Sequence, residues 1–260
     1  MRNPELWKPT KLALVPETRA GHAANAPALR VPGDKQALGA GSTLMATLVA
    51  RWYQAALAQH ARGVMLELGC GAMPYHPLYR ERTSAVWCTD WPQSIHQQPH
   101  ADLFCDLNAN LPLKNAMADT VLLADVLEHI YRPQALLAET FRVLRPGGVL
   151  LLNTPFMYWV HEAPHDYYRF TPHALQRLAQ DAGFEVLALN AVGGSLCVLA
   201  DVAGKLLAAL PVAGPLLARG LQRGLLALLR PLPLSASSPL FVAAVLRRPV
   251  LRQPVSRQPL

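Results

Sequence analysis

Short apolar runs, each closed by a polar residue, alternate with helical patterns through the centre of the chain. Five of these runs are candidate strands, at 64–68, 85–89, 103–105, 120–124 and 149–153. Short apolar runs bounded by turn residues are typical of strands that are buried on both faces. Before the fifth run, helical spacing over 133–144 stops at Arg145-Pro146-Gly147-Gly148. The alternation predicts an α/β fold with a doubly wound, Rossmann-like sheet.

The pattern continues on both sides of this region. An apolar stripe predicts a helix that begins near Ser42 or Thr43 and ends near His60. The stripe consists of Leu44, Leu48, Trp52, Ala55 and Leu57. A further helix over 172–182 precedes two candidate strands, 184–189 and 240–246, and a leucine-rich segment separates those strands.

The same pattern divides the 260 residues into one large domain with additions at both ends. Residues 1–41 hold five prolines and little periodicity, so we expect an irregular basic arm. The domain is expected over 42–248, with a helical insertion at 195–235, and an irregular tail over 249–260.

Acidic residues end or follow four of the candidate strands, namely Glu67, Asp90, Asp106 and Asp125. Ligands of open α/β sheets bind outside the carboxyl ends of the strands, so these residues mark a candidate binding edge. The first strand runs into the turn Gly69-Cys70-Gly71, where backbone N–H groups can approach a ligand closely. Pro74 stands where an NAD-binding turn would have its third glycine, which weighs against NAD.

Several segments around this edge occur in a fixed order. They are Glu67-Leu68-Gly69-Cys70-Gly71, Asp90, Asp106-Leu107, Asp125-Val126-Leu127-Glu128-His129 and Arg142-Val143-Leu144-Arg145-Pro146-Gly147-Gly148. Together they resemble the class I S-adenosylmethionine-dependent methyltransferases of the type 11 group, over roughly residues 60–190. The resemblance implies a seven-stranded sheet, mostly parallel, with an antiparallel last strand and, in this chain, a helical insertion.

The resemblance also implies a cofactor site for S-adenosyl-L-methionine. Glu67 would help to hold the methionine part, and the backbone of Gly69, Cys70 and Gly71 would approach it. Asp90, with Trp91 beside it, would accept hydrogen bonds from the two ribose hydroxyls. Asp106 and Leu107 would contact the adenine, and Asp125 and Val126 would face the methionine amine and the methyl group. His129 follows as either a site residue or a structural histidine.

Charge is distributed unevenly along the chain. The net charge is +7, but residues 63–195 carry eight basic and 13 acidic residues, a net of −5. S-adenosylmethionine carries a sulfonium and an ammonium cation, which an acidic strand edge attracts. The basic character therefore belongs to the two ends of the chain. No aromatic-interleaved basic patch appears there, so a nucleic-acid substrate is not favoured.

A histidine-rich segment, 161–171, follows the fifth candidate strand. It contains His-Glu-x-x-His, the sequence motif of zinc proteases. Pro164 inside it opposes the helix that would put His161 and His165 on one face, so no metal site is expected. We interpret the segment instead as an acceptor loop. His161 or His165 is the candidate catalytic base.

The remaining residues of the segment are candidates for acceptor binding. Glu162 or Asp166 would orient the base, and Tyr167, Tyr168 and Arg169 would bind a sugar face or an anionic group. The alternative is that the cluster only packs the loop against the core, with Thr171 capping the helix that follows.

The insertion at 195–235 interleaves leucines with Lys205, Arg219, Arg223 and Arg230. One interpretation is a basic amphipathic helix lying on an anionic membrane surface. The other is that its helices cover the acceptor pocket or form a dimer face. Both interpretations favour a bulky or lipid-linked acceptor.

Cysteine usage and hydropathy bear on location. The four cysteines form no CxxC pair, which is typical of reduced, cytosolic proteins and argues against structural zinc. The mean hydropathy of +0.16 is high, yet no window holds about 18 uninterrupted apolar residues, and the first ten residues lack the apolar part of a secretory signal. A cytoplasmic protein, with peripheral contact at the inner membrane face, is predicted.

These observations lead to one functional hypothesis and one alternative. The hypothesis is an S-adenosylmethionine-dependent methyltransferase that moves a methyl group to a small or lipid-linked acceptor, with oxygen as the expected acceptor atom. The alternative is a non-catalytic S-adenosylmethionine-binding or membrane-surface-associated protein on the same fold. The residues do not decide between oxygen, nitrogen and carbon as acceptor, nor do they give the oligomeric state.

Overall fold

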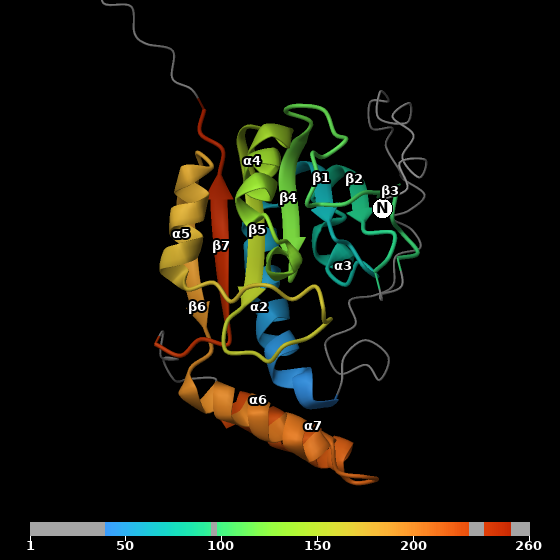
Figure 1. Ribbon diagram of the computed structural model, residues 1–260, viewed down its shortest axis with the longest axis vertical. Helices are drawn as coiled ribbons and strands as arrows, with labels where there is room; N and C mark the ends of the chain where they lie inside the picture. Colours follow the sequence, from blue (N-terminus) through green and yellow to red (C-terminus); the bar gives the residue numbers. More distant parts are fainter. Residues whose placement is uncertain (1–39, 95–97, 229–236, 251–260) are drawn as a thin grey trace, which may run out of the picture.

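The computed structural model describes residues 40–94, 98–228 and 237–250. They form a central sheet with helices on both faces and a pair of helices across one end (Figure 1). The arm predicted for residues 1–41 and the tail predicted from 249 lie almost entirely outside the described residues.

The sheet has seven strands in the order β3-β2-β1-β4-β5-β7-β6. Only β7 runs antiparallel to its neighbours, pairing with β5 on one side and β6 on the other. The strands are β1 (Gly63–Leu68), β2 (Thr83–Asp90), β3 (Leu103–Phe104), β4 (Ala118–Ala124), β5 (Leu144–Pro155), β6 (Glu185–Val192) and β7 (Phe241–Arg247). The predicted fold class is confirmed, including the antiparallel last strand.

Helices cover the two faces of the sheet because its strands are apolar on both sides. α2 (Thr43–His60) and the short α3 (His76–Tyr79) lie over one face, and α4 (Pro133–Val143) and α5 (Pro172–Asp181) over the other. Neighbouring residues of a strand point to opposite faces. Leu122 of β4 therefore packs with the α2 layer, while Val121 and Leu123 pack with the α4 layer.

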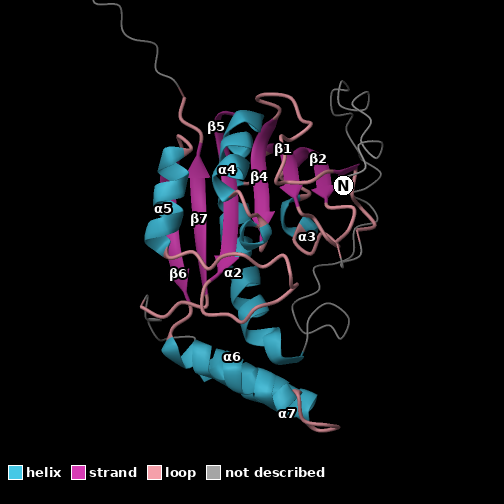
Figure 2. Cartoon of the chain, in the orientation of Figure 1, coloured by secondary structure: helices cyan, strands magenta, loops and turns pink. Residues whose placement is uncertain are grey.

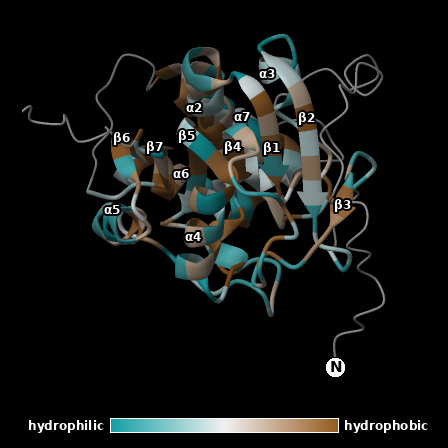
Figure 3. Cartoon of the chain, turned by 90° about the horizontal axis from the view of Figure 1, so that it is seen from above, coloured by the Kyte–Doolittle hydropathy of each residue, from teal (hydrophilic) through white to brown (hydrophobic). Residues whose placement is uncertain are grey.

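The helix α5 packs on the sheet with only one of its sides. α5 buries only Leu175 and Ala179, and it is largely teal in the hydropathy view of Figure 3, because its other sides face solvent. Thr171 accepts a hydrogen bond from the Ala174 N–H at 3.1 Å and caps this helix, as the alternative interpretation of the loop expected.

Three local predictions differ from the structure. The fifth strand was expected to begin at Val149, after the helix stop at 145–148, but β5 already begins at Leu144, which pairs with Ala118 across an irregular register. Ser42 precedes α2 as expected, but its hydroxyl contacts the Tyr158 hydroxyl at 2.9 Å instead of capping the helix. Within α2, Ala55 was expected on the apolar stripe, but it is exposed, and Tyr53 is buried instead.

The insertion forms two helices, α6 (Ser195–Ala208) and α7 (Gly214–Leu228), followed by residues 229–236, which lie outside the described part. Their buried sides carry small or polar residues, namely Cys197, Ala200, Asp201, Gly204, Gly214, Ala218 and Gln222, with Leu226 as the large apolar one. Gln222 accepts a hydrogen bond from the Leu44 N–H at 3.0 Å and donates one to the Gly41 carbonyl at 2.6 Å. Gln222 thus caps α2 and fastens the pair to the domain.

The helix pair lies at the end of the sheet where the parallel strands β1, β4 and β5 finish (Figure 2). The loop between β5 and α5 crosses the same end. No helix within the described residues has the length and apolarity needed to cross a membrane. All four cysteines are buried and free.

Candidate active site

The turn after β1 contains two glycines, Gly69 and Gly71, whose surroundings differ. Both are in the left-handed region, at φ +72° for Gly69 and +48° for Gly71. A Cβ on Gly69 would lie 2.5 Å from the Val126 side chain, so this position is closed by packing. A Cβ on Gly71 would meet nothing within 4 Å. Gly71 therefore borders open space at the predicted binding edge.

Asp90, at the end of β2, is buried beside this turn. Its Oδ2 accepts the Gly71 N–H at 2.6 Å, and its Oδ1 accepts the Trp91 N–H at 2.7 Å. Each carboxylate oxygen can accept more than one hydrogen bond, so acceptor capacity remains for a ligand. The structure thus brings together Gly71, Asp90 and Trp91, as the sequence predicts.

Asp106 and Leu107 lie one strand further along the edge. The Cys105 N–H donates to the Asp90 carbonyl at 3.0 Å, which holds the chain after β3 against the end of β2. Leu107 is buried and Asp106 is half-buried, with its Oδ1 accepting the Asn108 N–H at 2.9 Å. Asp106 continues the line of acidic groups from Asp90, and Leu107 adds an apolar side chain next to it.

Glu67 lies near the end of β1 and is almost completely buried. Its Oε2 accepts the Tyr79 hydroxyl at 2.5 Å. Burial raises the pKa of Glu67 to about 7, an effect that nearby Asp90 adds to and the hydrogen bond from Tyr79 opposes. A cationic ligand would favour the ionised form of this carboxyl.

This raised pKa predicts a pH dependence of cofactor affinity. A bound cation lowers the pKa of Glu67, so affinity should rise by about tenfold between pH 5.5 and 7.5. The stability of the free protein changes in the opposite direction. The Glu67 carboxyl ionises at a lower pH in the unfolded chain than in the folded one, so the free energy of unfolding falls as pH rises from about 4.5 to 7. Calorimetric titrations with S-adenosylmethionine at several pH values check this, and Glu67→Gln should flatten the profile. Superimposable profiles for the two proteins would remove Glu67 from the binding edge.

Asp125 follows β4 with a left-handed backbone, φ +50°. The Asn153 amide donates to its Oδ1 at 2.5 Å, and Tyr53 donates to the same amide's oxygen at 2.7 Å. Burial raises the pKa of Asp125 to about 7, opposed by Asn153 and assisted by Glu162. Sequence reasoning missed Tyr53 as a partner, since it lies 100 residues from Asn153 on the buried side of α2.

The two glycines of the turn predict different losses. Gly71→Ala places a methyl group in open space and should weaken cofactor binding at least tenfold while costing about 1 kcal/mol of stability for the left-handed backbone. Gly69→Ala clashes with Val126 and should lower the melting temperature more. Thermal melts and calorimetry on the two variants measure this difference. Unchanged affinity in Gly71→Ala would mean that no ligand passes this position.

The loop 156–171 contains no helix, so His161 and His165 do not form the zinc-protease arrangement. Asp166 and Arg169 organise it. Asp166 accepts Arg169 at 2.6 and 2.7 Å and the His161 N–H at 2.8 Å. Burial alone would raise the pKa of Asp166, but these donors lower it to about 2.

Arg169 uses its donors inside the loop. Besides Asp166, it donates to the carbonyls of Tyr158, Trp159 and Tyr168, at 2.7 to 3.2 Å. These contacts account for the five N–H groups of a guanidinium. The structure therefore gives Arg169 a positioning role, and its predicted contact with an anionic acceptor stays a prediction.

The histidines of the loop have different surroundings. His161 is half-buried, and burial lowers its pKa, with His129 adding to the effect. His165 is exposed, with its ring 5.0 Å from Trp91 and its Nδ1 3.1 Å from the Tyr167 hydroxyl. Tyr167 and Tyr168 are exposed beside it. The contact with Trp91 places the loop next to the predicted cofactor residues.

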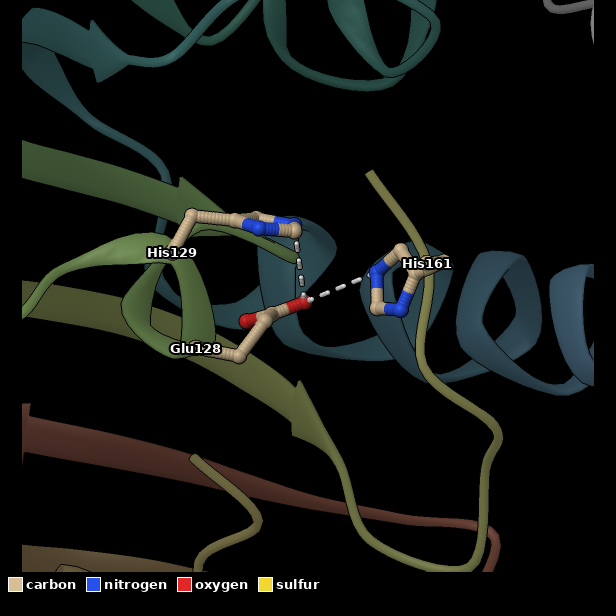
Figure 4. A group of neighbouring side chains, drawn as sticks. All are labelled: Glu128, His129 and His161. Carbon is tan, nitrogen blue, oxygen red and sulfur yellow. Dashed lines mark ion pairs between the residues drawn. The ribbon is translucent and has the colours of Figure 1, made fainter. Parts of the chain in front are cut away.

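Three side chains from two segments meet behind this loop (Figure 4). Glu128 and His129 belong to η4 (Leu127–His129), a single 3₁₀ turn after β4, and His161 comes from the loop. Sequence reasoning left His129 undecided and did not select Glu128. The signal was an acid followed by a histidine just after an acidic strand end, in Asp125-Val126-Leu127-Glu128-His129.

Comparison with protein families identifies the domain. Residues 66–152 match the family model described as a methyltransferase domain, of type 11. This part of the chain is similar to the type 11 methyltransferases. The predicted resemblance to class I S-adenosylmethionine-dependent methyltransferases is confirmed for these residues.

Curated relatives agree over the same region. A probable S-adenosylmethionine-dependent methyltransferase of Mycolicibacterium smegmatis is 34% identical over 96 residues, which are 35% of this chain and 37% of that protein. A malonyl-[acyl-carrier protein] O-methyltransferase of Serratia marcescens is 32% identical over 101 residues, 36% of this chain and 39% of that protein. The chain thus spans less than two fifths of the length of these curated relatives.

Solved methyltransferase structures share the fold. The 1,6-didemethyltoxoflavin-N1-methyltransferase of Burkholderia thailandensis has a TM-score of 0.50 at 16% identity, covering 78% of this chain and 79% of that one. A methyltransferase of Mesorhizobium loti has a TM-score of 0.50 at 15% identity, covering 76% and 98%. At these identities the likeness concerns the fold alone.

The residues at the predicted binding edge of the sheet fit S-adenosylmethionine. Gly71 borders open space, Asp90 keeps acceptor capacity for vicinal hydroxyls, and Glu67 lies further in as a carboxyl for a cation. A nucleoside with a positively charged tail matches this order of groups.

Proposed function

We propose that this protein transfers the methyl group of S-adenosylmethionine to an acceptor presented at a membrane surface, with oxygen as the acceptor atom. The carrying observation is the line of Gly71, Asp90 and Glu67, which fits the cofactor, beside a loop that carries histidines and exposed aromatic side chains.

S-adenosylmethionine supplies a methyl group on a positively charged sulfur, and the sulfur keeps the electron pair when the carbon–sulfur bond breaks. The acceptor oxygen forms the new bond to carbon and loses its proton. Transfer of this kind depends on alignment of the reacting atoms. Asp90, Glu67 and the glycine turn would fix the cofactor, and the loop clamped by Asp166 and Arg169 would fix the acceptor.

The proton of the acceptor needs a destination. His161 and His165 are the candidate bases, and His161 has the closer fit to the role. It is half-buried, and its lowered pKa keeps the ring neutral near pH 7. His165 is exposed, and its Nδ1 already contacts Tyr167. Glu162 and Tyr168 stay candidates for contact with the acceptor.

The helix pair supports a lipid-linked acceptor. Exposed apolar side chains occur on α6, on α7 and in the connection between them, namely Leu196, Leu199, Val202, Leu206, Leu210, Leu216, Leu217, Leu221 and Leu228. Large exposed apolar patches mark interaction sites. The only acid of the two helices, Asp201, is buried and paired with Lys205, and Arg219 and Arg223 lie on α7.

An anionic membrane is the occupant that this charge distribution fits best. The Lys205 ammonium lies 3.5 Å from the Tyr158 ring centre and also over Trp159, which ties α6 to the acceptor loop. A membrane bound by the pair would therefore lie near the loop. The location that follows is the cytoplasm at the inner membrane face.

The cofactor half of the proposal is tested by calorimetry. We expect S-adenosylmethionine and S-adenosylhomocysteine to bind at one site and to compete. Absence of heat together with absence of competition would overturn the proposal.

The acceptor half is tested by transfer of labelled methyl groups. The protein is incubated with methyl-labelled S-adenosylmethionine and a total polar lipid extract, and separately with an aqueous metabolite extract. We expect label in the organic phase of the lipid reaction. Label only in the aqueous reaction would replace the lipid-linked acceptor by a small polar one, and binding without any transfer would favour the non-catalytic alternative.

A further inference from the structure

The cluster of Glu128, His129 and His161 has an unpaired atom at its centre. The Glu128 side chain is 0% exposed, and its Oε1 has no hydrogen-bond partner. Its other oxygen accepts the Thr154 hydroxyl at 3.3 Å. A buried carboxylate oxygen without a partner carries a substantial desolvation cost, so such an atom calls for an explanation.

Both histidines direct Nε2 toward this oxygen. The His129 Nε2 lies 3.7 Å from Glu128 Oε1, and the His161 Nε2 lies 3.9 Å from it (Figure 4). These separations are too long for hydrogen bonds. One ligand atom from each of the three residues lies within 4.8 Å of the other two. Ligand atoms about 2.1 Å from a tetrahedral ion lie about 3.4 Å apart, so the three side chains would move closer together around a common ion.

The other ring nitrogens determine which atoms carry protons. The His129 Nδ1 lies 2.8 Å from the His165 carbonyl oxygen, which can only accept, so Nδ1 is the donor. The His161 Nδ1 lies 3.2 Å from Asp166 Oδ2 and 3.3 Å from the Trp159 carbonyl, both acceptors. The Arg169 Nη2 is also 3.5 Å away, but its two N–H groups are directed to Asp166 Oδ2 and the Trp159 carbonyl, each at 2.7 Å. In the neutral rings each Nε2 therefore carries a lone pair. Three lone pairs face one point.

This arrangement has the features of a metal centre. Metal-binding histidines commonly donate their second N–H to a carboxylate or a carbonyl, which fixes the ring and its tautomer. Two imidazoles and one carboxylate are a ligand set of zinc enzymes and of mononuclear iron sites, with positions left open for a substrate.

We propose that Nε2 of His129, Nε2 of His161 and Oε1 of Glu128 bind one divalent transition-metal cation. The site departs from the sequence-based expectation of no metal, because the rejected His-Glu-x-x-His pair contributes only His161, and the other two ligands come from η4. Asp166 acts as a positioning residue that orients His161.

The role of the cation rests on the proposed methyl transfer. The site lies at the carboxyl end of β4 and β5, between Asp125 and the acceptor loop. An acceptor hydroxyl bound to the metal would lose its proton to solvent more readily, and the resulting oxygen would form the bond to the methyl carbon. His161 would then hold the acceptor through the metal and would not take the proton itself.

Metal binding is tested on the purified full chain stripped with a chelator, without S-adenosylmethionine. We expect Zn²⁺ titration calorimetry to give one site per chain, and Co²⁺ to give visible d–d absorption. His129→Ala and His161→Ala should each weaken binding at least tenfold, and Asp166→Asn by about 10- to 100-fold. His173→Ala, on α5, is the matched control and should bind like the wild type. Stoichiometry far below one, or wild-type affinity in both ligand variants, would overturn the site.

The role is tested separately from binding. If the metal holds the acceptor, a chelator should abolish methyl transfer, leave cofactor affinity unchanged, and be reversed by added Zn²⁺ or Co²⁺. Transfer that survives complete metal removal would return His161 to the part of a free base. Because the metal titration contains no cofactor, its outcome stands even if the proposed function fails.

Discussion

Asp90→Ala should reduce the affinity for S-adenosylhomocysteine by at least 100-fold. The substitution removes the two hydrogen bonds expected from the ribose hydroxyls, each worth about 1.5–3 kcal/mol when the acceptor is charged. It also releases the Gly71 and Trp91 N–H groups, which the carboxylate now holds at 2.6 and 2.7 Å. Asp90→Asn keeps an acceptor oxygen and should lose less, on the order of tenfold.

A ligand lacking one hydroxyl separates the ribose contact from a general disturbance of the turn. The wild type should prefer S-adenosylhomocysteine to its 2′-deoxy analogue, and Asp90→Ala should bind the two equally. Asp106→Asn is the matched control at the same edge and should keep the preference. Thermal melts check that each variant is folded. A preserved preference in Asp90→Ala would mean that the ribose lies elsewhere.

Leu199→Glu combined with Leu206→Glu should abolish binding to anionic vesicles. These leucines are 65% and 63% exposed on the outer side of α6, seven residues apart and so on one face. Burying a leucine in an apolar phase is worth about 1.5–3 kcal/mol, so losing two should lower partitioning by 100-fold or more. The measurement is co-sedimentation with vesicles of 30% phosphatidylglycerol in phosphatidylcholine.

The matched control places the same charge away from the helix pair. Leu187→Glu changes a 39% exposed leucine on β6 and should leave vesicle binding intact. Arg219→Ala with Arg223→Ala should weaken binding to anionic vesicles and reduce its salt dependence. If the wild type ignores vesicles but sediments as a dimer that the double variant loses, the occupant of this face is a second copy of the chain.

The strands were predictable because buried parallel strands leave a local signature. Val64 to Leu68 and Thr120 to Ala124 form apolar runs whose ends fall at the acidic edge. The start of β5 was not predictable, because proline and two glycines signal a turn while the pairing of Leu144 with Ala118 extends the strand. Pairing between distant segments outweighs local preference here.

The residues of the site could be predicted only where each one directly follows the end of a predicted strand. Gly71 and Asp90 follow strand ends, and the sequence places them together. The cluster of Glu128, His129 and His161 joins segments more than 30 residues apart, so no local pattern indicates it. Gln222 escaped notice for the same reason, since it caps α2 from 178 residues away.

The helical insertion connects β6 and β7, two strands that pair with each other. Val192, the last residue of β6, lies opposite Phe241, the first of β7, and the Leu240 N–H donates to the Val192 carbonyl at 2.8 Å. The chain thus leaves and re-enters at one point, and a segment of different length closes the same gap at little entropic cost. Evolution can exchange such a segment without altering the hairpin or the glycine turn. The helices α6 and α7 can therefore change in length and sequence while the pairing of β6 with β7 is kept.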